Sequence, residues 1–142
     1  MRAALILTLC LFSCNNTFFS SKKQNNNIII SLQKTACFGT CPEYKLDIYE
    51  NGKVLYLGTR HVEHIGEKQV FIDFMEIQSI LKYAKKNNFF RMKNEYSEPI
   101  SDLPTTYIRI KGKKIKDYSG APNELKELVK IIENKVFKRI IK

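Results

Sequence analysis

The chain has 142 residues, of which 24 are Lys or Arg and 14 are Asp or Glu, so its formal net charge is +10. Hydrophobic residues make up 44% of the chain and aromatic residues 11%. This composition excludes an intrinsically disordered protein and suits one globular domain with a single hydrophobic core.

The first fourteen residues have the pattern of a bacterial export signal. One cation, Arg2, precedes an uncharged run over residues 3–12 that is too short to span a bilayer. The run ends in Leu11-Phe12-Ser13-Cys14, which resembles a lipobox, the motif whose cysteine is acylated and becomes the first mature residue. The pattern predicts a signal peptide over residues 1–13 and lipidation, including palmitate, at Cys14. An ordinary cleaved signal and an uncleaved N-terminal helix remain as alternatives.

A lipid on Cys14 would make the membrane a partner of this protein and would place it in the cell envelope, facing the periplasm or the cell surface. Exported chains rarely meet nucleic acid, so we expect no nucleic-acid partner. The positive charge fits an envelope protein or an anionic envelope polymer as partner, or a surface that is merely soluble. Residues 14–27 are polar and without periodicity, which predicts a flexible tether. A single domain is then expected over residues 28–142.

The first half of this domain has the pattern of strands. Residues 28–35 are rich in β-branched side chains and predict a strand. Residues 44–49 and 53–58 flank Asn51-Gly52, the dipeptide typical of a two-residue type I′ hairpin turn. Such a turn would pair Glu50 with Lys53.

That pairing also predicts the register of the hairpin. It places Ile48 opposite Leu55 and Leu46 opposite Leu57, so that these four side chains share one apolar face. The second strand of the hairpin is expected to continue over residues 59–62.

A further strand over residues 69–72 is followed by the signals of a helix. Asp73 and Glu76 have the spacing of a capping box. The residues behind them place an apolar stripe on one helix face, namely Phe74, Ile77, Ile80, Leu81 and Ala84. Residues 93–104 are expected to form a loop.

The second half repeats the order of strands and then a helix. Residues 105–110 alternate between apolar and polar, the turn at residues 111–113 reverses the chain, and residues 115–118 return. After residues 119–122, apolar residues at helical spacing predict a long helix (Leu125, Leu128, Val129, Ile132, Val136 and Ile140). The predicted class is α+β, with two layers: a meandering, mainly antiparallel sheet and two helices on one face.

Cys37 and Cys41 are the cysteines that remain in the expected domain. In an oxidising compartment such a close pair predicts a disulfide. Gly39 permits a positive φ and Pro42 disfavours helix, so a tight bridged loop is feasible. A closed loop of about five residues stabilises by roughly 2 kcal/mol, which is enough to brace the entry to the hairpin.

Thiol redox chemistry and metal binding are the alternatives for this pair. Redox motifs place C-x-x-C at a helix N-terminus, whereas Cys37 and Cys41 have C-x₃-C spacing between two strands. A zinc site would recruit His61 and His64, but their spacing is short and, in an expected strand, residues three apart point to opposite faces. We therefore expect a structural disulfide, no metal site and no cofactor.

Three segments carry a resemblance to a known family. The first is Cys-Phe-Gly-Thr-Cys-Pro-x-Tyr over residues 37–44, followed by the turn at residues 51–52; the others are residues 101–105 and 117–122. Together they resemble DUF6438-like domains, an uncharacterised bacterial family often found on lipoproteins. The resemblance spans residues 28 to the last helix. It supports the prediction of a lipoprotein but implies no activity, cofactor or catalytic residue.

The remaining polar residues predict a binding module rather than an enzyme. The sequence has no G-x-S-x-G, no phosphate-binding glycine loop and no HExxH motif, so we expect no catalytic residue. Tyr44, Asp102 and Asp117, together with the cysteine loop, form a candidate ligand cleft. We expect a lipid-anchored, non-enzymatic binding or accessory module of the cell envelope, with a thiol-redox or Cys/His metal-binding protein as the alternative.

Overall fold

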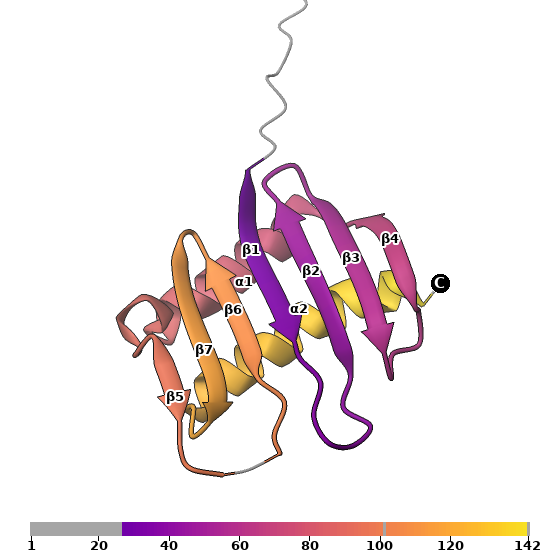
Figure 1. Cartoon of the computed structure of the whole chain (residues 1–142). Coiled ribbons are helices and arrows are strands. Elements are labelled where there is room, and N and C mark those ends of the chain that lie inside the picture. Colours follow the sequence, from indigo (N-terminus) through magenta and orange to yellow (C-terminus); the bar gives the residue numbers. More distant parts are fainter. Residues whose placement is uncertain (1–26, 101, 142) are drawn as a thin grey trace, which may run out of the picture.

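The computed structural model describes residues 27–100 and 102–141 (Figure 1). Their elements, in chain order, are β1 (Ile28–Lys34), β2 (Glu43–Tyr49), β3 (Lys53–Arg60), β4 (Gly66–Phe71), α1 (Phe74–Lys86), the 3₁₀ turn η1 (Phe89–Arg91), β5 (Glu95–Ser97), β6 (Thr106–Ile110), β7 (Lys113–Ser119) and α2 (Asn123–Ile140). Within these ranges, neither helix is long and apolar enough to cross a membrane. The predictions for residues 1–26, including Cys14, lie outside the described residues.

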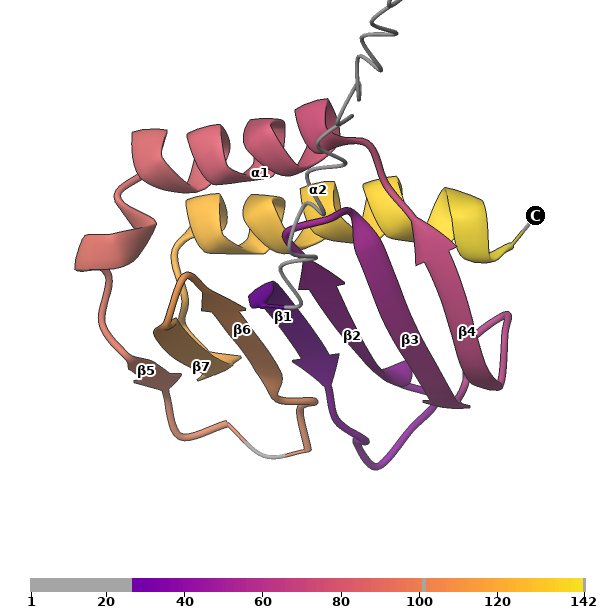
Figure 2. The same ribbon diagram turned by 90° about the horizontal axis from the view of Figure 1, so that it is seen from above.

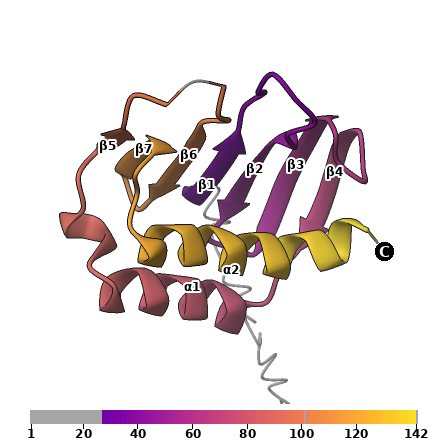
Figure 3. The ribbon, with the colours of Figure 1, turned by 90° about the horizontal axis from the view of Figure 1, so that it is seen from below.

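The strands form one seven-stranded sheet in the order β4-β3-β2-β1-β6-β7-β5. Neighbouring strands are antiparallel except β5 and β7, which are parallel. The predicted α+β class with a mainly antiparallel sheet is confirmed. Figures 2 and 3 view the molecule from opposite ends, and both show α1 and α2 on the same side of the sheet.

The sheet therefore has a covered face, which is turned toward the helices, and an open face. Strand residues alternate between the two because successive side chains point to opposite sides of a strand. The covered face carries buried side chains such as Ile30, Leu46 and Ile108. The open face carries polar, charged and half-exposed apolar side chains, namely Ser31, Gln33, Lys45, Asp47, Tyr49, Lys53, Leu55, Leu57, Tyr107, Arg109, Lys114 and Lys116.

Both helices bury one apolar stripe against the covered face, as predicted from their spacing. In α1 the buried residues are Ile77, Ile80 and Ala84, whereas Phe74 is 65% exposed. In α2 the six predicted core positions are all buried. Each fully buried Ile or Leu side chain contributes about 1.5–3 kcal/mol relative to an exposed one, so this core is the main source of stability.

An ionic contact joins the start of α1 to the end of α2. The Glu76 carboxylate accepts a hydrogen bond from the backbone N–H of Asp73 at 3.1 Å, which is the reach-back of the predicted capping box. It also accepts from Arg139 Nη2 at 2.6 Å. Partial burial by itself raises the pKa of the Glu76 carboxyl, but these hydrogen bonds and the positive charge of Arg139 outweigh it and hold the pKa below its ordinary value.

The predicted register of the first hairpin is wrong by one residue. The turn has three residues, with Gly52 in the left-handed region at φ +86° and its N–H bonded to Tyr49 O at 3.0 Å. Ile48 therefore pairs with Val54, which points to the core, and Leu55 points to the open face. Gly52 is required because a Cβ there would lie 2.5 Å from the Ile72 carbonyl oxygen.

The type I′ turn expected at residues 51–52 occurs instead in the hairpin between β6 and β7. Lys111 and Gly112 have φ values of +45° and +88°, the two positive values that a type I′ turn requires. Both hairpins have a Gly directly before their second strand, yet one has a three-residue turn and the other a two-residue turn. Local sequence alone therefore did not decide the length of the turn.

Two further expectations need correction. The predicted loop over residues 93–104 contains the edge strand β5, which has only three residues and shows no apolar alternation. The predicted continuation of the hairpin through residue 62 ends at Arg60, because His61 has φ +53° and turns the chain. His64 lies in the same turn, so neither histidine lies in a strand.

Candidate functional site

Three stretches that carry the family resemblance meet at one end of the sheet, whereas the turn at residues 51–52 lies at the other end (Figure 1). Residues 35–42 connect β1 to β2, residues 98–105 connect β5 to β6, and residues 117–122 lead from β7 into α2 (Figure 1). Backbone hydrogen bonds tie them together: Thr35 N–H donates to Thr105 O at 3.0 Å, and Glu98 N–H donates to Ser119 O at 3.3 Å. We call this region the motif end.

The loop over residues 35–42 presents an exposed aromatic ring. The sulfur atoms of Cys37 and Cys41 lie at disulfide distance, with their Cα atoms 5.7 Å apart. Gly39 does not use a positive φ, and its N–H donates to Cys37 Sγ at 3.2 Å. Phe38, between them, is 94% exposed. A short bridged loop thus holds an apolar side chain out in solvent.

A cleft of about 220 Å³ opens beside this loop, between the sheet and α2. Its walls come from β1, β6, β7 and the first half of α2, and they carry charges of both signs. The lining residues are Lys34, Thr106, Asp117, Leu125, Lys126, Val129, Lys130 and Glu133.

Tyr44 supports one wall of the cleft through Glu133. The buried Tyr44 hydroxyl donates to Glu133 Oε1 at 2.5 Å, and Lys34 Nζ lies 2.6 Å from the same oxygen. Burial first, and then the negative charge of Glu133, raise the pKa of the Tyr44 hydroxyl far above its ordinary value. Tyr44 is therefore a permanent hydrogen-bond donor that orients the Glu133 carboxylate.

Asp117 lies on the opposite wall and has an unused acceptor. Its Oδ1 is buried and has no hydrogen-bond partner among the described residues. Burial raises the pKa of the Asp117 carboxyl and outweighs the opposing hydrogen bond from the Ala121 backbone and the charge of Lys126. Because an unpaired buried oxygen is costly, this position favours a ligand that donates an N–H or O–H group.

Of the predicted cleft residues, the structure brings two to the same place. Asp117 lines the cleft and Tyr44 reaches it through Glu133, whereas Asp102 is exposed at φ +67° and is not among the lining residues. Sequence reasoning missed the residues that α2 contributes. Their signal was the i, i+4, i+7 spacing of Lys126, Lys130 and Glu133, which places three ionic side chains on one helix face.

The described residues give no support to the alternative metal site. Across residues 27–100 and 102–141, no three His, Cys, Asp or Glu side chains are grouped so that they could hold a metal ion. His61 is exposed, and its neighbour His64 packs near the Tyr56 ring, with the two centroids 6.2 Å apart.

Comparison with known proteins identifies a family. A family model described as "Domain of unknown function (DUF6438)" matches residues 28–136, a range that includes all three segments of the motif end. A search of the curated proteins finds no match.

Proposed function

The chain belongs to the DUF6438 family, and on this premise we propose that it is a lipid-anchored domain of the bacterial cell envelope that binds another envelope protein through its motif end. The observation that carries this proposal is that three separate motif segments meet at one end of the sheet, where Asp117 of the third segment lines the cleft and Phe38 of the first is exposed. Segments that are distant in sequence and serve only to connect strands have no need to share one end of the sheet.

The position of the start of β1 supports this arrangement. Glu50 N–H donates to Asn27 O at 3.1 Å, and Lys111 N–H donates to Ile29 O at 2.9 Å, so the start of β1 lies beside the two hairpin turns. The motif end is at the opposite end of the strands (Figure 1). A domain held at residue 28 by a lipid on Cys14 would thus present its motif end away from the point of attachment.

The chemistry of the motif end suits a protein partner. An exposed aromatic side chain on a constrained loop loses little conformational entropy on binding, and aromatic anchors dominate the energetics of protein interfaces. Phe38 supplies this anchor, and the loop that leads into β6 carries a second exposed apolar side chain, Leu103, which is 38% exposed. The cleft beside them adds charged groups and the unpaired Asp117 oxygen for specific hydrogen bonds.

The groups of the cleft act in binding rather than in catalysis. Lys34, Tyr44 and Glu133 already engage one another, and the raised pKa of Tyr44 makes it unsuited to accept or lose a proton at neutral pH. The bridged cysteines brace the loop that carries Phe38.

The anchor is tested by palmitate labelling of the full-length chain in cells, with Cys14→Ala and Cys10→Ala as matched variants. We expect label and membrane association to disappear in the first and to persist in the second. Labelling that survives Cys14→Ala would refute the anchor.

The motif end is tested by in-cell crosslinking. Phe38 is replaced by p-benzoylphenylalanine, and Phe74, which is 65% exposed at the start of α1, is replaced in a matched control. We expect one discrete adduct with an envelope protein from position 38 only, and its loss when Asp117→Ala is added. Equal adducts from both positions, or none from position 38, would refute a partner at the motif end.

A further inference from the structure

Two cations face each other on the open face of the sheet, away from the motif end's cleft. Arg109 of β6 and Lys114 of β7 are directly opposite in the antiparallel register, and both are exposed. Like charges in this position repel one another and destabilise a strand pair. Both side chains are exposed, so neither fills the core.

The neighbouring charges on this face are already paired. Lys45 Nζ lies 3.1 Å from Asp47, and Lys116 Nζ lies 2.9 Å from Glu95. By contrast, Arg109 and Lys114 form no ion pair with any residue in the ranges that the structure describes. Among the described residues, therefore, no carboxylate lies within ion-pair distance of either cation.

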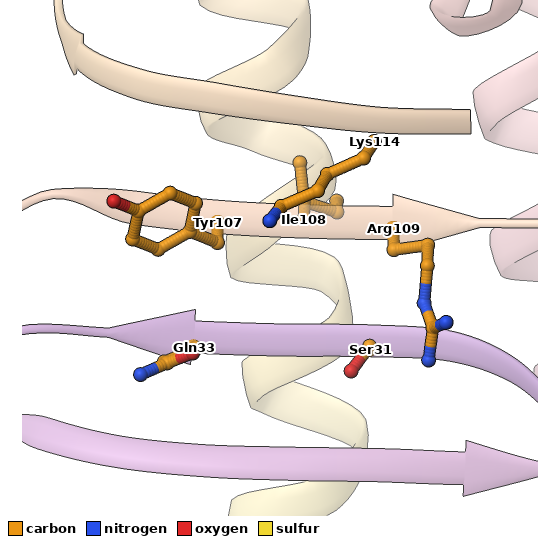
Figure 4. A pocket seen from close by; sticks show the side chains of 6 residues that line it. All are labelled: Ser31, Gln33, Tyr107, Ile108, Arg109 and Lys114. Atoms are coloured by element: carbon orange, nitrogen blue, oxygen red, sulfur yellow. The ribbon is translucent and has the colours of Figure 1, made fainter. Parts of the chain in front are cut away.

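A hollow of about 190 Å³ lies between these two side chains and their neighbours. In Figure 4, Lys114 reaches from β7 across β6 toward Tyr107, and Arg109 reaches from β6 toward Ser31 on β1. Lys114 Nζ lies 5.0 Å from the centre of the Tyr107 ring. The rest of the lining offers hydroxyl and amide groups from Ser31, Gln33 and Tyr107.

We propose that this basic hollow binds the oxyanion groups of an anionic polymer, a chain that carries phosphate or carboxylate on its repeating units. The planar guanidinium of Arg109 can donate two parallel hydrogen bonds to either group, and Lys114 adds a point charge from the opposite strand. An oxyanion between them would turn a repulsive pair into two attractive contacts. The Gln33 amide can hydrogen-bond the rest of a polar unit, whereas the Ser31 hydroxyl already donates to Asp47 Oδ1.

The shape of the surface favours a polymer over a small molecule. Small ligands bind in pockets that enclose them, whereas this hollow lies on an uncovered sheet. A second hollow of about 360 Å³ lies on the same face over β2, β3 and β4, but its lining includes the carboxylates of Asp47 and Glu67. The anionic groups are therefore expected over β1, β6 and β7, and an extended chain can continue past the rim of the first hollow because that hollow lies on the open face.

The experiment measures binding of the full-length chain, in a neutral detergent, to inorganic polyphosphate and to polygalacturonate. The test variant is Arg109→Gln with Lys114→Gln. The matched control is Lys82→Gln with Lys86→Gln, which removes the same charge from another exposed like-charge pair, on α1. We expect the test variant to bind at least tenfold more weakly and the control to stay within twofold of the wild type.

The two polymers distinguish phosphate from carboxylate as the recognised group, and binding of either supports the proposal. An equal loss in both double variants would show that overall charge is responsible and would overturn it. No wild-type binding to either polymer would also overturn it. So would tighter binding to phosphatidylglycerol vesicles that depends on the same two residues, because the partner would then be a membrane surface.

Thermal unfolding provides a readout that does not depend on the binding assay. Because a like-charge pair is removed, we expect the variant Arg109→Gln with Lys114→Gln to melt at or above the wild-type temperature. The bound polymer should raise the melting temperature of the wild type and leave that of the variant unchanged. A variant that melts well below the wild type would show that the two cations support the fold, which would overturn the proposal.

Discussion

The covered and open faces of the sheet are made from the same strands, yet they obey different constraints. On the covered face, residues such as Ile108 are fully buried against the helices, and any change of volume there alters packing. On the open face, the neighbouring Arg109 contacts solvent. The difference implies that stability is concentrated on one face, so that the other can carry charges, including the like-charged pair for which we propose a binding role.

Adjacent residues of β6 provide the sharpest test of this contrast. Ile108→Ala removes a fully buried side chain and is expected to lower the free energy of unfolding by about 2–5 kcal/mol. Arg109→Ala, one position along, is expected to change it by no more than about 0.5 kcal/mol. Urea denaturation of both variants measures the two values, and similar losses would contradict the separation of the faces.

The bridged loop lies beyond both faces, so its contribution comes from the unfolded chain rather than from packing. The double variant Cys37→Ser with Cys41→Ser is expected to lose about 2 kcal/mol, since a five-residue closed loop restricts the unfolded state only modestly. Denaturation under non-reducing conditions measures the loss. Two freely alkylated thiols at these positions in the unreduced protein, or stoichiometric zinc, would contradict a structural disulfide.

The register of the first hairpin decides which of two adjacent apolar residues belongs to the core. Val54 is fully buried and Leu55 is 39% exposed, so Val54→Ala should cost about 1.6 kcal/mol for two buried methyl groups. Leu55→Ala should cost less, although it removes the larger side chain. If the order of the two losses were reversed in chemical denaturation, the register predicted from the type I′ turn would be the right one.

The helical side of the molecule also has an ionic contact that depends on pH. Glu76→Gln should lower stability at pH 7 by about 1 kcal/mol through loss of the charged contact with Arg139, because a Gln side chain can still accept the capping hydrogen bond from Asp73 N–H. The pKa of Glu76 is held below its ordinary value of 4.5, so the carboxylate stabilises the fold fully above that value and loses this effect as the pH falls through the lowered pKa.

Unfolding measured between pH 7 and pH 2 should therefore show the wild type and the Glu76→Gln variant converging in acid. Glu127→Gln, at an exposed pair 4.0 Å from Lys130, is the control and should leave the curve unchanged. A constant difference at all pH values would show that the charge of Glu76 is not responsible.

The smallest expected effect is a gain on the open face. Lys114→Glu places a carboxylate directly opposite Arg109 and should raise the free energy of unfolding by about 0.5 kcal/mol. Lys93→Glu changes the net charge equally at an exposed position outside the strands and should have no measurable effect. A loss of stability in Lys114→Glu would contradict the repulsion inferred for the wild-type pair.

The candidate site was only partly predictable. Tyr44 and Asp117 stood out because they lie within motif segments, but their relation depends on Glu133, which is 89 residues from Tyr44 in the chain. Nothing local marks Glu133 as the partner of Tyr44. Asp102 lies in a motif segment as well, yet the conformation of its loop leaves it outside the cleft lining.

Local sequence by itself determined both helices and the six longer strands, the helix cap at Asp73, the apolar stripes of both helices and the pairing candidates Cys37 and Cys41. These features follow from side-chain periodicity and from hydrogen bonds that are short in sequence. The tertiary structure decided the hairpin register, the edge strand β5, the cleft and the opposition of Arg109 and Lys114. Each of these depends on which distant backbone segments pair, and pairing energy is shared over a whole sheet rather than encoded at any one residue.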